Sequence, residues 1–482
     1  MNRIIILSIC FIIGVVACYE DKGNYDYHSI NEVSISNIEN EYVREKWQNL
    51  SISPKLDFLI EETDNMAYRW EFDGKLVSEE RDLSYDVDLN VADDAYKCRF
   101  TAIHLEDSSR YYCDFSLRVV TPYDKGLMVL SEQDGKAMLS FLADNEEGDN
   151  FDKWVYYKEN GDYLDGIPLS LEQPDFAYNS EIFVTTSRGV YRLDKNILKL
   201  LKLYNGETML VKQSDFEIKS CSFMDITAYE PWGAVIDSKG VPYIFRERND
   251  YWASPSPNPI PVYDDIDVLI NYELDEQFIL TVIGYGSTGR FLGYDNLEGR
   301  FLYFRKQSSP DPEQFNRVTI RTPIIGIPAL AIGMFAYEEY ASFFYDPETG
   351  VAKVVPTHDA TFSNVKEENV ITLENHDFTP KTILRFCDAT ERAIYSSGST
   401  IRQIRMRNVA GGSTLLSDKL PTDAEITCLK LSVDKKRLYV GVSLDNEDEF
   451  KGNLYVLNAV SGNIINTYSA VGGKIVDVIE KF

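Results

Sequence analysis

Cys18 is the residue whose neighbours in the sequence most clearly indicate a chemical reaction, the attachment of acyl chains. Arg3 precedes an almost wholly apolar segment, Ile4–Val16, and the small residue Ala17 stands directly before the cysteine. The apolar segment is shorter than the ~20 residues that a membrane-spanning helix needs, so residues 1–17 are predicted to be a cleaved signal peptide. Cleavage would leave Cys18 at the new N-terminus, where acyl chains on its thiol would anchor the protein to a membrane.

The segment Val15-Val16-Ala17-Cys18 resembles a bacterial lipobox, in which the cysteine is lipidated. A plain secretory signal with a chance cysteine is the alternative. Glu20 and Asp21 follow, and acidic residues at these places resemble the surface-export signal of lipoproteins in the Bacteroidetes phylum. We therefore expect residues 18–27 to be a lipidated tether. The resemblance implies an outer-membrane protein that faces the extracellular side.

Catalytic signatures are missing from the rest of the chain. Only four histidines occur, and neither His358 nor His376 lies in a recognisable motif for a nucleophilic triad. Carboxylates are abundant, but a glycosidase needs one pair held about 5 to 10 Å apart, and no local pattern singles out a pair. The sequence therefore predicts no catalytic residue, no cofactor and no enzyme activity.

Clusters of aspartate raise the possibility of calcium binding. None has the glycine and terminal glutamate spacing of an EF-hand loop, so solvated acidic loops are the preferred interpretation and no metal site is predicted. The clusters are Asp86, Asp88, Asp93 and Asp94, then Asp264, Asp265 and Asp267, and finally residues 445–449.

Five cysteines remain once Cys10 is cleaved off and Cys18 is acylated: Cys98, Cys113, Cys221, Cys387 and Cys428. No pair has the C-x-x-C spacing of a zinc or redox motif. Buried free thiols are favoured. A disulfide between Cys98 and Cys113 stays open, because they could face each other on neighbouring strands.

Several aromatic residues occur in polar loops, where a core role is not evident. Aromatic faces stack on sugar rings and peptide side chains, and nearby carboxylates accept hydrogen bonds. We expect ligand or partner contact at two places, with packing into the core as the alternative. The first contains Trp154, Tyr156, Tyr157 and Tyr163, and the second contains Tyr251 and Trp252 before a proline-rich stretch.

The net charge excludes one class of partner. The formal charge is −29, whereas nucleic-acid binding needs clustered cations, so nucleic acid is not expected as a partner. An anionic bilayer would repel the same surface. The lipid anchor is thus the expected membrane attachment.

Residues 28–120 read as a β-sandwich of the immunoglobulin class. Short segments with period-two alternation recur between turn residues, as at 33–38, 50–54, 67–72, 95–103 and 111–120. Tyr68, Trp70 and Phe72 fall on one face before an Asp-Gly turn, and Trp70 is the expected core tryptophan. This arrangement looks like a PKD domain.

Residues 126–482, after a short hinge at 121–126, read as a β-propeller. Glycine turns flanked by apolar and aromatic segments recur roughly fifty residues apart, at 135, 189, 240, 299, 350, 398 and 462. Glycine at each hairpin is expected to supply positive φ. One blade per turn gives about seven blades, with six or eight as alternatives.

Two further segments of this region have expected places. Residues 426–468 should form one complete four-stranded blade, and Lys474–Phe482 a strand that closes the ring. The apolar run 324–336 is too short to span a membrane and is broken by Pro328, so we expect strand and loop near the propeller axis. A patch for a membrane partner is the minority interpretation.

The opening residues 18–27, the Tyr68–Gly74 segment and Leu127–Lys136 together resemble the PKD-like lipoprotein family of Bacteroidetes. Such proteins are typically encoded beside SusC/SusD-type importers, in which a TonB-dependent barrel takes up oligosaccharides or peptides. The resemblance implies an accessory surface lipoprotein that binds or positions oligopeptide or glycan for uptake, with the transporter and neighbouring lipoproteins as partners. A surface hydrolase and an adhesin are the rival hypotheses.

Overall fold

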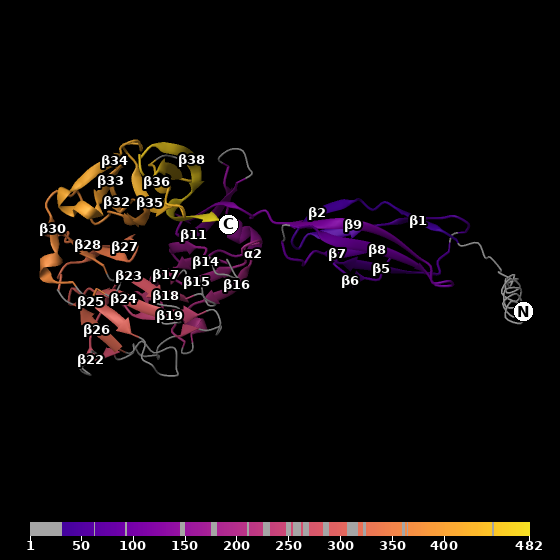
Figure 1. The fold of residues 1–482 in the computed structure, drawn as a ribbon, viewed down its shortest axis with the longest axis horizontal. Coiled ribbons are helices and arrows are strands. Elements are labelled where there is room, and N and C mark those ends of the chain that lie inside the picture. The colour runs from indigo at the N-terminus through magenta and orange to yellow at the C-terminus, as the bar shows by residue number, and fades with distance from the viewer. Residues whose placement is uncertain are drawn as a thin grey trace, which may run out of the picture. The chain divides into compact units, whose positions relative to one another are not determined.

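The structure is a computed structural model, and it describes residues 31–61, 63–91, 94–144, 150–174, 181–209, 212–224, 232–246, 252–253, 262–263, 269–282, 289–305, 317–321, 324–358, 362–363, 365–445 and 448–482. Cys18, Glu20 and Asp21 lie outside these residues. The chain divides into two compact units, Met1–Val120 and Thr121–Phe482. Both are built from strands, which confirms the all-β prediction (Figure 1). Among the described residues, no helix has the length and apolarity to cross a bilayer.

The first unit is a sandwich around one hydrophobic core. A five-stranded sheet has the order β2-β9-β8-β5-β6, and two strand pairs, β1-β4 and β3-β7, share its core (Figure 1). The strands are β1 (Val33–Ser36), β2 (Glu41–Glu45), β3 (Asn49–Ile52), β4 (Lys55–Phe58), β5 (Met66–Phe72), β6 (Lys75–Ser78), β7 (Leu83–Asp86), β8 (Tyr96–His104) and β9 (Arg110–Val120). The five strand segments predicted here are all strands.

Trp70 is the core tryptophan of this unit, as predicted. Its side chain is fully buried, with ring centroids 4.4 Å from Phe100 and 6.0 Å from Phe115. Its indole N–H donates to the Glu80 carbonyl oxygen at 2.9 Å. A buried tryptophan is stable only when its polar N–H finds an acceptor, so this bond fixes the position of the loop after β6.

The cysteines Cys98 and Cys113 are free thiols on neighbouring strands. Cys98 lies opposite Phe115, and Cys113 lies opposite Phe100. The two cysteines are therefore diagonal neighbours, and such residues are roughly 7–8 Å apart, farther than a disulfide allows. Burial raises the pKa of Cys98 to about 12, so its thiol stays protonated.

The described part of the second unit forms seven sheets, most of which are built from consecutive strands. The first has the order β12-β11-β10-β39, with β10 (Gly126–Gln133), β11 (Lys136–Ala143), β12 (Asp152–Lys153) and β39 (Lys474–Lys481). The second contains β13 (Pro168–Glu172), β14 (Ile182–Thr186), β15 (Gly189–Leu193) and β16 (Leu200–Tyr204), and the third β17 (Ile218–Met224), β18 (Trp232–Asp237), β19 (Pro242–Arg246) and β20 (Trp252–Ala253). The fourth has the order β22-β21-β26-β25-β24-β23, with β21 (Val262–Tyr263), β22 (Leu269–Ile270), β23 (Leu274–Val282), β24 (Gly289–Asp295), β25 (Arg300–Arg305) and β26 (Arg317–Arg321).

Three more sheets complete this unit. The fifth contains β27 (Ala329–Ala336), β28 (Glu339–Tyr345), β29 (Ala352–Thr357) and β30 (Ile371–Leu373). The sixth contains β31 (Leu384–Cys387), β32 (Arg392–Ser397), β33 (Thr400–Arg405) and β34 (Ser413–Ser417), and the seventh β35 (Glu425–Leu431), β36 (Arg437–Ser443), β37 (Gly452–Asn458) and β38 (Ile464–Gly472). The seventh sheet is the four-stranded unit predicted from residues 426–468.

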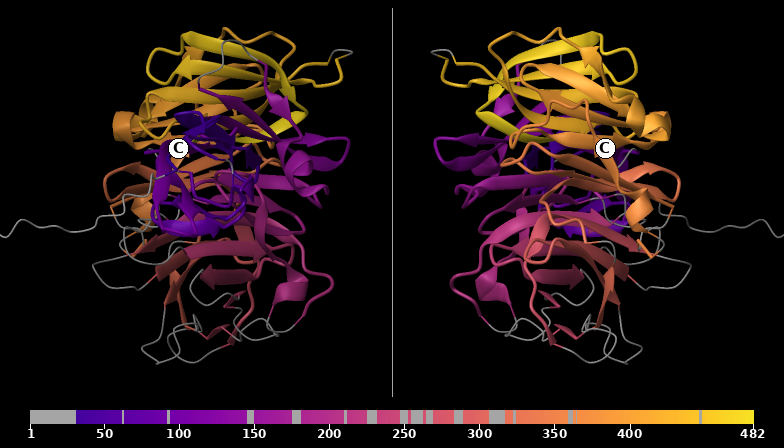
Figure 2. Two further views of the ribbon diagram at one scale, coloured as in Figure 1. Left: turned by 90° about the vertical axis from the view of Figure 1, so that its right-hand side faces the viewer. Right: turned by 90° about the vertical axis from the view of Figure 1, so that its left-hand side faces the viewer.

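The strand at one edge of each sheet, here called its first strand, lies beside the first strands of two other sheets. Their order of contact is β39, β13, β17, β23, β27, β31, β35 and again β39. The predicted C-terminal strand is present as β39, and it pairs antiparallel with β10 at the start of the unit. In both side views the yellow C-terminal strands lie next to the purple strands that begin this unit (Figure 2).

The apolar run 324–336 forms a loop and the first strand β27, as predicted. β27 lies between β23 and β31. Ile324 and Met334 keep exposed side chains, while Phe335 is buried.

The glycine turns follow the prediction at all seven positions, where each joins two consecutive strands of one sheet. Six join the second and third strands of a sheet, whereas Gly462 joins the third and fourth strands, β37 and β38. Positive φ was expected at each, and this is wrong for Gly189. There a Cβ atom would lie 2.8 Å from both the Tyr204 carbonyl oxygen and the Leu203 side chain, so close approach of a strand explains that glycine.

Short 3-10 helices connect some of the strands in the described part. They are η1 (Gly206–Thr208), η2 (Glu367–Asn369), η3 (Asp388–Thr390) and η4 (Met406–Gly411). The one α-helix in the described part is α2 (Val155–Asn160), within an aromatic segment that the sequence predicted as loop.

Candidate functional site

A polar cavity of about 460 Å³ lies where the first strands of the second unit meet, and we call it the central cavity. Six of the seven first strands contribute to its wall, each with at least one charged side chain. These charged residues are Glu172 on β13, Lys219 on β17, Glu276 on β23, Arg385 on β31, Lys430 on β35 and Asp477 on β39. Three cations and three anions therefore surround one space.

Asp477 and Lys430 form the most strongly fixed pair in this wall. The ammonium of Lys430 lies 3.0 and 3.1 Å from the two carboxylate oxygens of Asp477. Backbone N–H groups of Leu171 and Val478 donate to the same carboxylate at 3.0 and 2.9 Å. Burial disfavours the charged lysine, but the carboxylates of Asp477 and Glu172 outweigh that effect and raise the pKa of Lys430.

Arg385 is held in a different way. Its Nε donates to the Leu429 carbonyl oxygen at 3.0 Å, and its Nη1 donates to the Leu384 carbonyl oxygen at 2.9 Å. Two main-chain acceptors thus orient the guanidinium, while the residue remains exposed to solvent. Within the described residues, Arg385 has no carboxylate partner.

The wall also contains hydroxyl groups with unused hydrogen-bonding capacity. The side-chain oxygens of Ser170 and Ser220 are buried and meet no hydrogen-bond partner among the described residues. Buried hydroxyls are normally paired with protein or an internal water, and these two are candidates for such a water. The adjacent Cys221 thiol stays protonated, because burial raises its pKa well above the ordinary value.

A second cavity, of about 520 Å³, lies between the first and seventh sheets, and we call it the seam cavity. Arg437 lies 2.5 Å from the Glu480 carboxylate, which also accepts a hydrogen bond from the Tyr439 hydroxyl. Lys481 is buried here and donates to the Asp124 carbonyl oxygen. Burial lowers the pKa of Lys481 to about 8.

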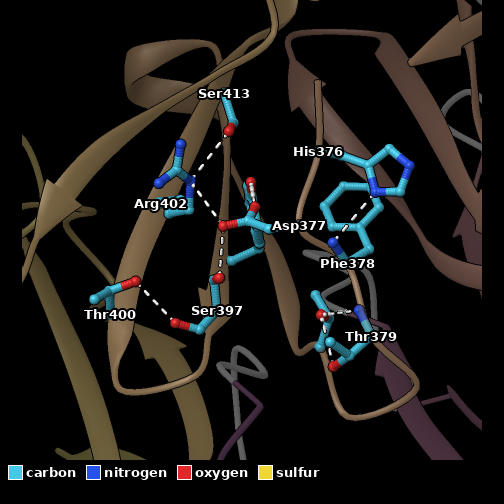
Figure 3. Close-up of polar contacts among 10 residues, drawn as sticks. His376, Asp377, Phe378, Thr379, Ser397, Thr400, Arg402 and Ser413 are labelled. Carbon is cyan, nitrogen blue, oxygen red and sulfur yellow. Dashed lines mark hydrogen bonds and ion pairs between the residues drawn. The ribbon is translucent and has the colours of Figure 1, made fainter. Parts of the chain in front are cut away.

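Asp377 is the centre of a third polar cluster, drawn in Figure 3. Tyr395 and Ser397 donate hydroxyl hydrogen bonds to its carboxylate at 2.5 and 2.6 Å, and Arg402 lies 3.2 Å from it. Arg402 also donates to the Ser413 hydroxyl at 3.1 Å. All these groups satisfy one another, which is the arrangement of a structural network.

The neighbouring His376 is not placed as a base for Ser397. Its Nδ1 accepts the Phe378 backbone N–H at 3.2 Å, so the other ring nitrogen carries the proton and donates to the Gly350 carbonyl oxygen at 3.1 Å (Figure 3). Ser397 itself donates to Asp377. Side chains of the triad type are therefore close in sequence and space but are not arranged for nucleophilic attack.

The first predicted aromatic site divides into a surface cluster and a core residue. Tyr157 stacks on Tyr163 with centroids 4.5 Å apart, and Trp154 meets the edge of Tyr163 at 5.3 Å. The ammonium of Lys136 lies 3.7 Å from the centroid of Tyr163. Tyr157 and Tyr163 are 41% and 37% exposed, and Trp154 is half-buried. Ligand or partner contact at this cluster therefore stays a prediction.

Tyr156 must be corrected, because it is buried in the core. It is 5% exposed and its ring packs against Tyr191 at 5.9 Å. Successive residues of a helix point about 100° apart, so in the short helix α2 Tyr157 faces solvent while Tyr156 faces the core. Of the second aromatic site, Tyr251 lies outside the described residues, and Trp252 lies in β20 with a side chain that is also outside them.

No group of three or more His, Cys, Asp or Glu side chains that could hold a metal ion occurs in the described ranges. Asp264, Asp265 and Asp267 lie outside those ranges.

Sequence reasoning missed the central cavity. A signal was present: several otherwise apolar or small-residue strands each carry a charged residue, and these recur at roughly fifty residues or a multiple of it, at 172, 219, 276, 385, 430 and 477. Their convergence depends on the first strands being neighbours, which the residue pattern alone did not reveal.

Comparison with solved structures places the fold among known ones. A quinoprotein alcohol dehydrogenase-like protein of Bacteroides thetaiotaomicron is similar over 92% of this chain and 97% of its own, with 12% identity and a TM-score of 0.51, which shows a shared fold. The extracellular domain of a protein described as a one-component system from the same species matches over 91% of this chain and 67% of its own, at 9% identity and a TM-score of 0.46. Kluyveromyces lactis Hsv2 matches over 61% and 75%, at 13% identity and a TM-score of 0.36.

No curated protein matches this chain. The family comparison is specific to its N-terminal third: residues 18–168 match the model of the PKD-like family, which covers the first unit and the beginning of the second.

Proposed function

We propose that this protein is a lipid-anchored binding subunit of a SusC/SusD-type nutrient importer at the outer surface of the outer membrane. Its second unit is a seven-bladed β-propeller, and the central cavity is its ligand site. The ligand is taken from the oligopeptides or glycans that such importers carry. The role is binding and positioning, with no catalytic residue assigned.

The propeller assignment is supported by the order in which the sheets meet. Seven first strands contact one another in a series that returns to its start, and β39 from the C-terminus completes the sheet begun by β10. Pairing the two ends of a ring in one sheet removes the free edges that an open array of sheets would expose. Propellers bind ligands where their inner strands converge, which is the position of the central cavity.

The anchored position is supported by the N-terminal residues. The PKD-like match begins at Cys18, the residue that the lipobox assigns as the mature N-terminus. The first unit then acts as a spacer. The Tyr111 hydroxyl donates to the Asn31 carbonyl oxygen where the chain enters, and β9 runs from Arg110 to the exit at Val120. Eleven strand residues span roughly 36 Å.

The central cavity is the observation that carries the binding role. Its wall holds six charged side chains, and three of them, Arg385, Lys430 and Asp477, are held in place by contacts of 2.9 to 3.1 Å. Its volume is in the range of small-molecule sites, about 300–1,000 Å³. A binding subunit needs such a preorganised polar wall, whereas a hydrolase also needs an activated nucleophile or a catalytic acid and base.

Copurification from the native outer membrane tests this proposal. The tagged protein, extracted in mild detergent, should bring down a TonB-dependent barrel and its lidding lipoprotein in stoichiometric amounts. The C18A variant should leave the membrane fraction, and E20A/D21A should stay in the membrane but lose surface exposure to added protease. Recovery of the wild type alone, or turnover of peptide or glycan by the purified protein, would overturn the assignment.

A further inference from the structure

The central cavity contains the exposed guanidinium of Arg385 and the neighbouring ammonium of Lys430. Together these two cations indicate which chemical group of a ligand binds there. Arg385 uses Nε and Nη1 for main-chain carbonyls, which leaves the N–H groups of Nη2 for another acceptor. Its orientation is set before any ligand arrives, so little side-chain entropy is lost on binding. A preoriented guanidinium favours planar anions, above all carboxylates.

Lys430 supplies the second positive charge. Arg385 bonds to the carbonyl of Leu429, the residue directly before Lys430, so the two cations stand on adjacent first strands, β31 and β35. The contact with Asp477 fixes one direction of the ammonium, and an ammonium has three donors. An anion bound to Arg385 therefore also lies in the field of Lys430.

The rest of the wall limits the ligand further. Glu276 on β23 and Glu172 on β13 balance the cations, so the cavity as a whole carries equal numbers of positive and negative groups. A polyanion would be repelled by these glutamates. A ligand with one carboxylate and otherwise neutral or cationic polar groups fits this wall.

We propose that the central cavity recognises a small ligand by its carboxylate, which Arg385 binds through its free N–H groups and Lys430 attracts. This inference rests on the proposed function and narrows its ligand to carboxylate-bearing molecules. The carboxylate has two possible sources, the C-terminus of a peptide or an acidic sugar.

Paired libraries separate these sources. The detergent-purified full-length protein is incubated with random tripeptides that have free C-termini and with the same library amidated, and retained molecules are identified by mass spectrometry. A second arm uses uronic-acid oligosaccharides and their carboxyl-reduced counterparts. Retention of the carboxylate form in either arm, at least about tenfold over its neutral partner, is expected. Equal retention of the two forms, or retention of neither form in both arms, would overturn the inference.

Variants test the assigned residues on the best retained compound. R385Q should weaken its binding about tenfold or more, and R385K should fall between, because lysine keeps the charge without the planar fork. E276Q removes an anion from the same wall, so it should raise the affinity for the carboxylate. R405Q, an exposed arginine on β33, is the surface control. Unchanged affinity in R385Q and R385K, both with wild-type melting temperature, would contradict the role of Arg385.

Copurification keeps this inference separable from the importer assignment. R385Q should still recover the transporter pair, because Arg385 faces the cavity. If the wild-type protein recovers the transporter pair but does not prefer carboxylates, only this inference is contradicted. If it prefers carboxylates but recovers no transporter, only the importer assignment is contradicted.

Discussion

Two lysines on neighbouring first strands, the half-buried Lys430 and the buried Lys481, lie in the two cavities of the second unit and differ in the groups that face them. Lys430 in the central cavity contacts the carboxylate of Asp477, and its pKa is raised. Lys481 in the seam cavity donates to a main-chain carbonyl, and burial lowers its pKa to about 8. The comparison teaches that burial alone does not decide the direction in which the pKa of a lysine shifts here. A carboxylate that faces the ammonium reverses the effect of burial.

The difference has a functional meaning. In the central cavity, Lys430 is paired with Asp477, and Arg385 is oriented by two main-chain carbonyls. A site for a polar ligand requires such charges in defined places. The seam cavity holds a cation that is only weakly compensated, and it therefore costs stability near neutral pH.

Removing the carboxylate from the central cavity should have the largest effect. We expect D477A to lower the free energy of unfolding by about 4 kcal/mol, because Lys430 and two backbone N–H groups lose their acceptor. Urea denaturation measures this. D445A, at the fully exposed pair of Asp445 with Lys451, should cost less than about 0.5 kcal/mol. A similar cost for both variants would remove the distinction between buried and exposed pairs.

The pH dependence of stability tests Lys481. Its pKa is about 8 in the folded chain and 10.5 in the unfolded chain, so the unfolded state binds more protons between these values and stability rises with pH across that window. The gain is on the order of 3 kcal/mol. Comparing K481M with wild type from pH 7 to 10 separates the contribution of Lys481 from that of the buried cysteines and tyrosines, because both proteins contain the latter. K481M should lack the rise, and parallel curves would show that Lys481 is charged throughout.

The Asp377 network provides a further comparison with the central cavity. It contains similar charged and hydroxyl groups, but its residues do not line either of the two cavities described above. D377N should lower the free energy of unfolding by about 2 kcal/mol, since Tyr395 and Arg402 lose a charged acceptor. Ligand binding should be unchanged. Calorimetric melting and the retention assay measure the two effects. Loss of binding with normal stability would mean that this cluster, and not the central cavity, holds the ligand.

The smallest effect is expected at the aromatic surface cluster. K136A removes the cation over the Tyr163 ring and should cost about 0.5 kcal/mol, because the site is partly exposed. Thermal unfolding gives the value, and T414A on the exposed edge of β34 serves as a surface control. If K136A weakened glycan or peptide retention, the cluster would be a second binding surface.

Local pattern was sufficient for much of the fold. The alternation around Trp70 predicted its strand and burial, and the glycine spacing predicted the hairpins of the second unit, because both signals depend on residues close in sequence. Gly189 shows the limit. Its type was informative, but the reason is the approach of Tyr204 in space, and the expected positive φ is absent.

The candidate site was much less predictable. The aromatic residues of 154–163 were chosen because they stand in a polar segment, yet helix α2 turns Tyr156 into the core and Tyr157 outward. Arg385, Lys430 and Asp477 were not chosen, because each is an ordinary charged residue within a strand and nothing local distinguishes it.

The sequence by itself determined the strands, most of their turns and the resemblance of Val15-Val16-Ala17-Cys18 to a lipobox. Each of these features is specified within a few neighbouring residues. The tertiary structure decided which strands meet and therefore which charges share a cavity. The residues of the central cavity span positions 169–477, and only the side-by-side packing of the first strands brings them together. Packing also decided that Lys430 faces a carboxylate and Lys481 a carbonyl, and this difference shifts their pKa values in opposite directions.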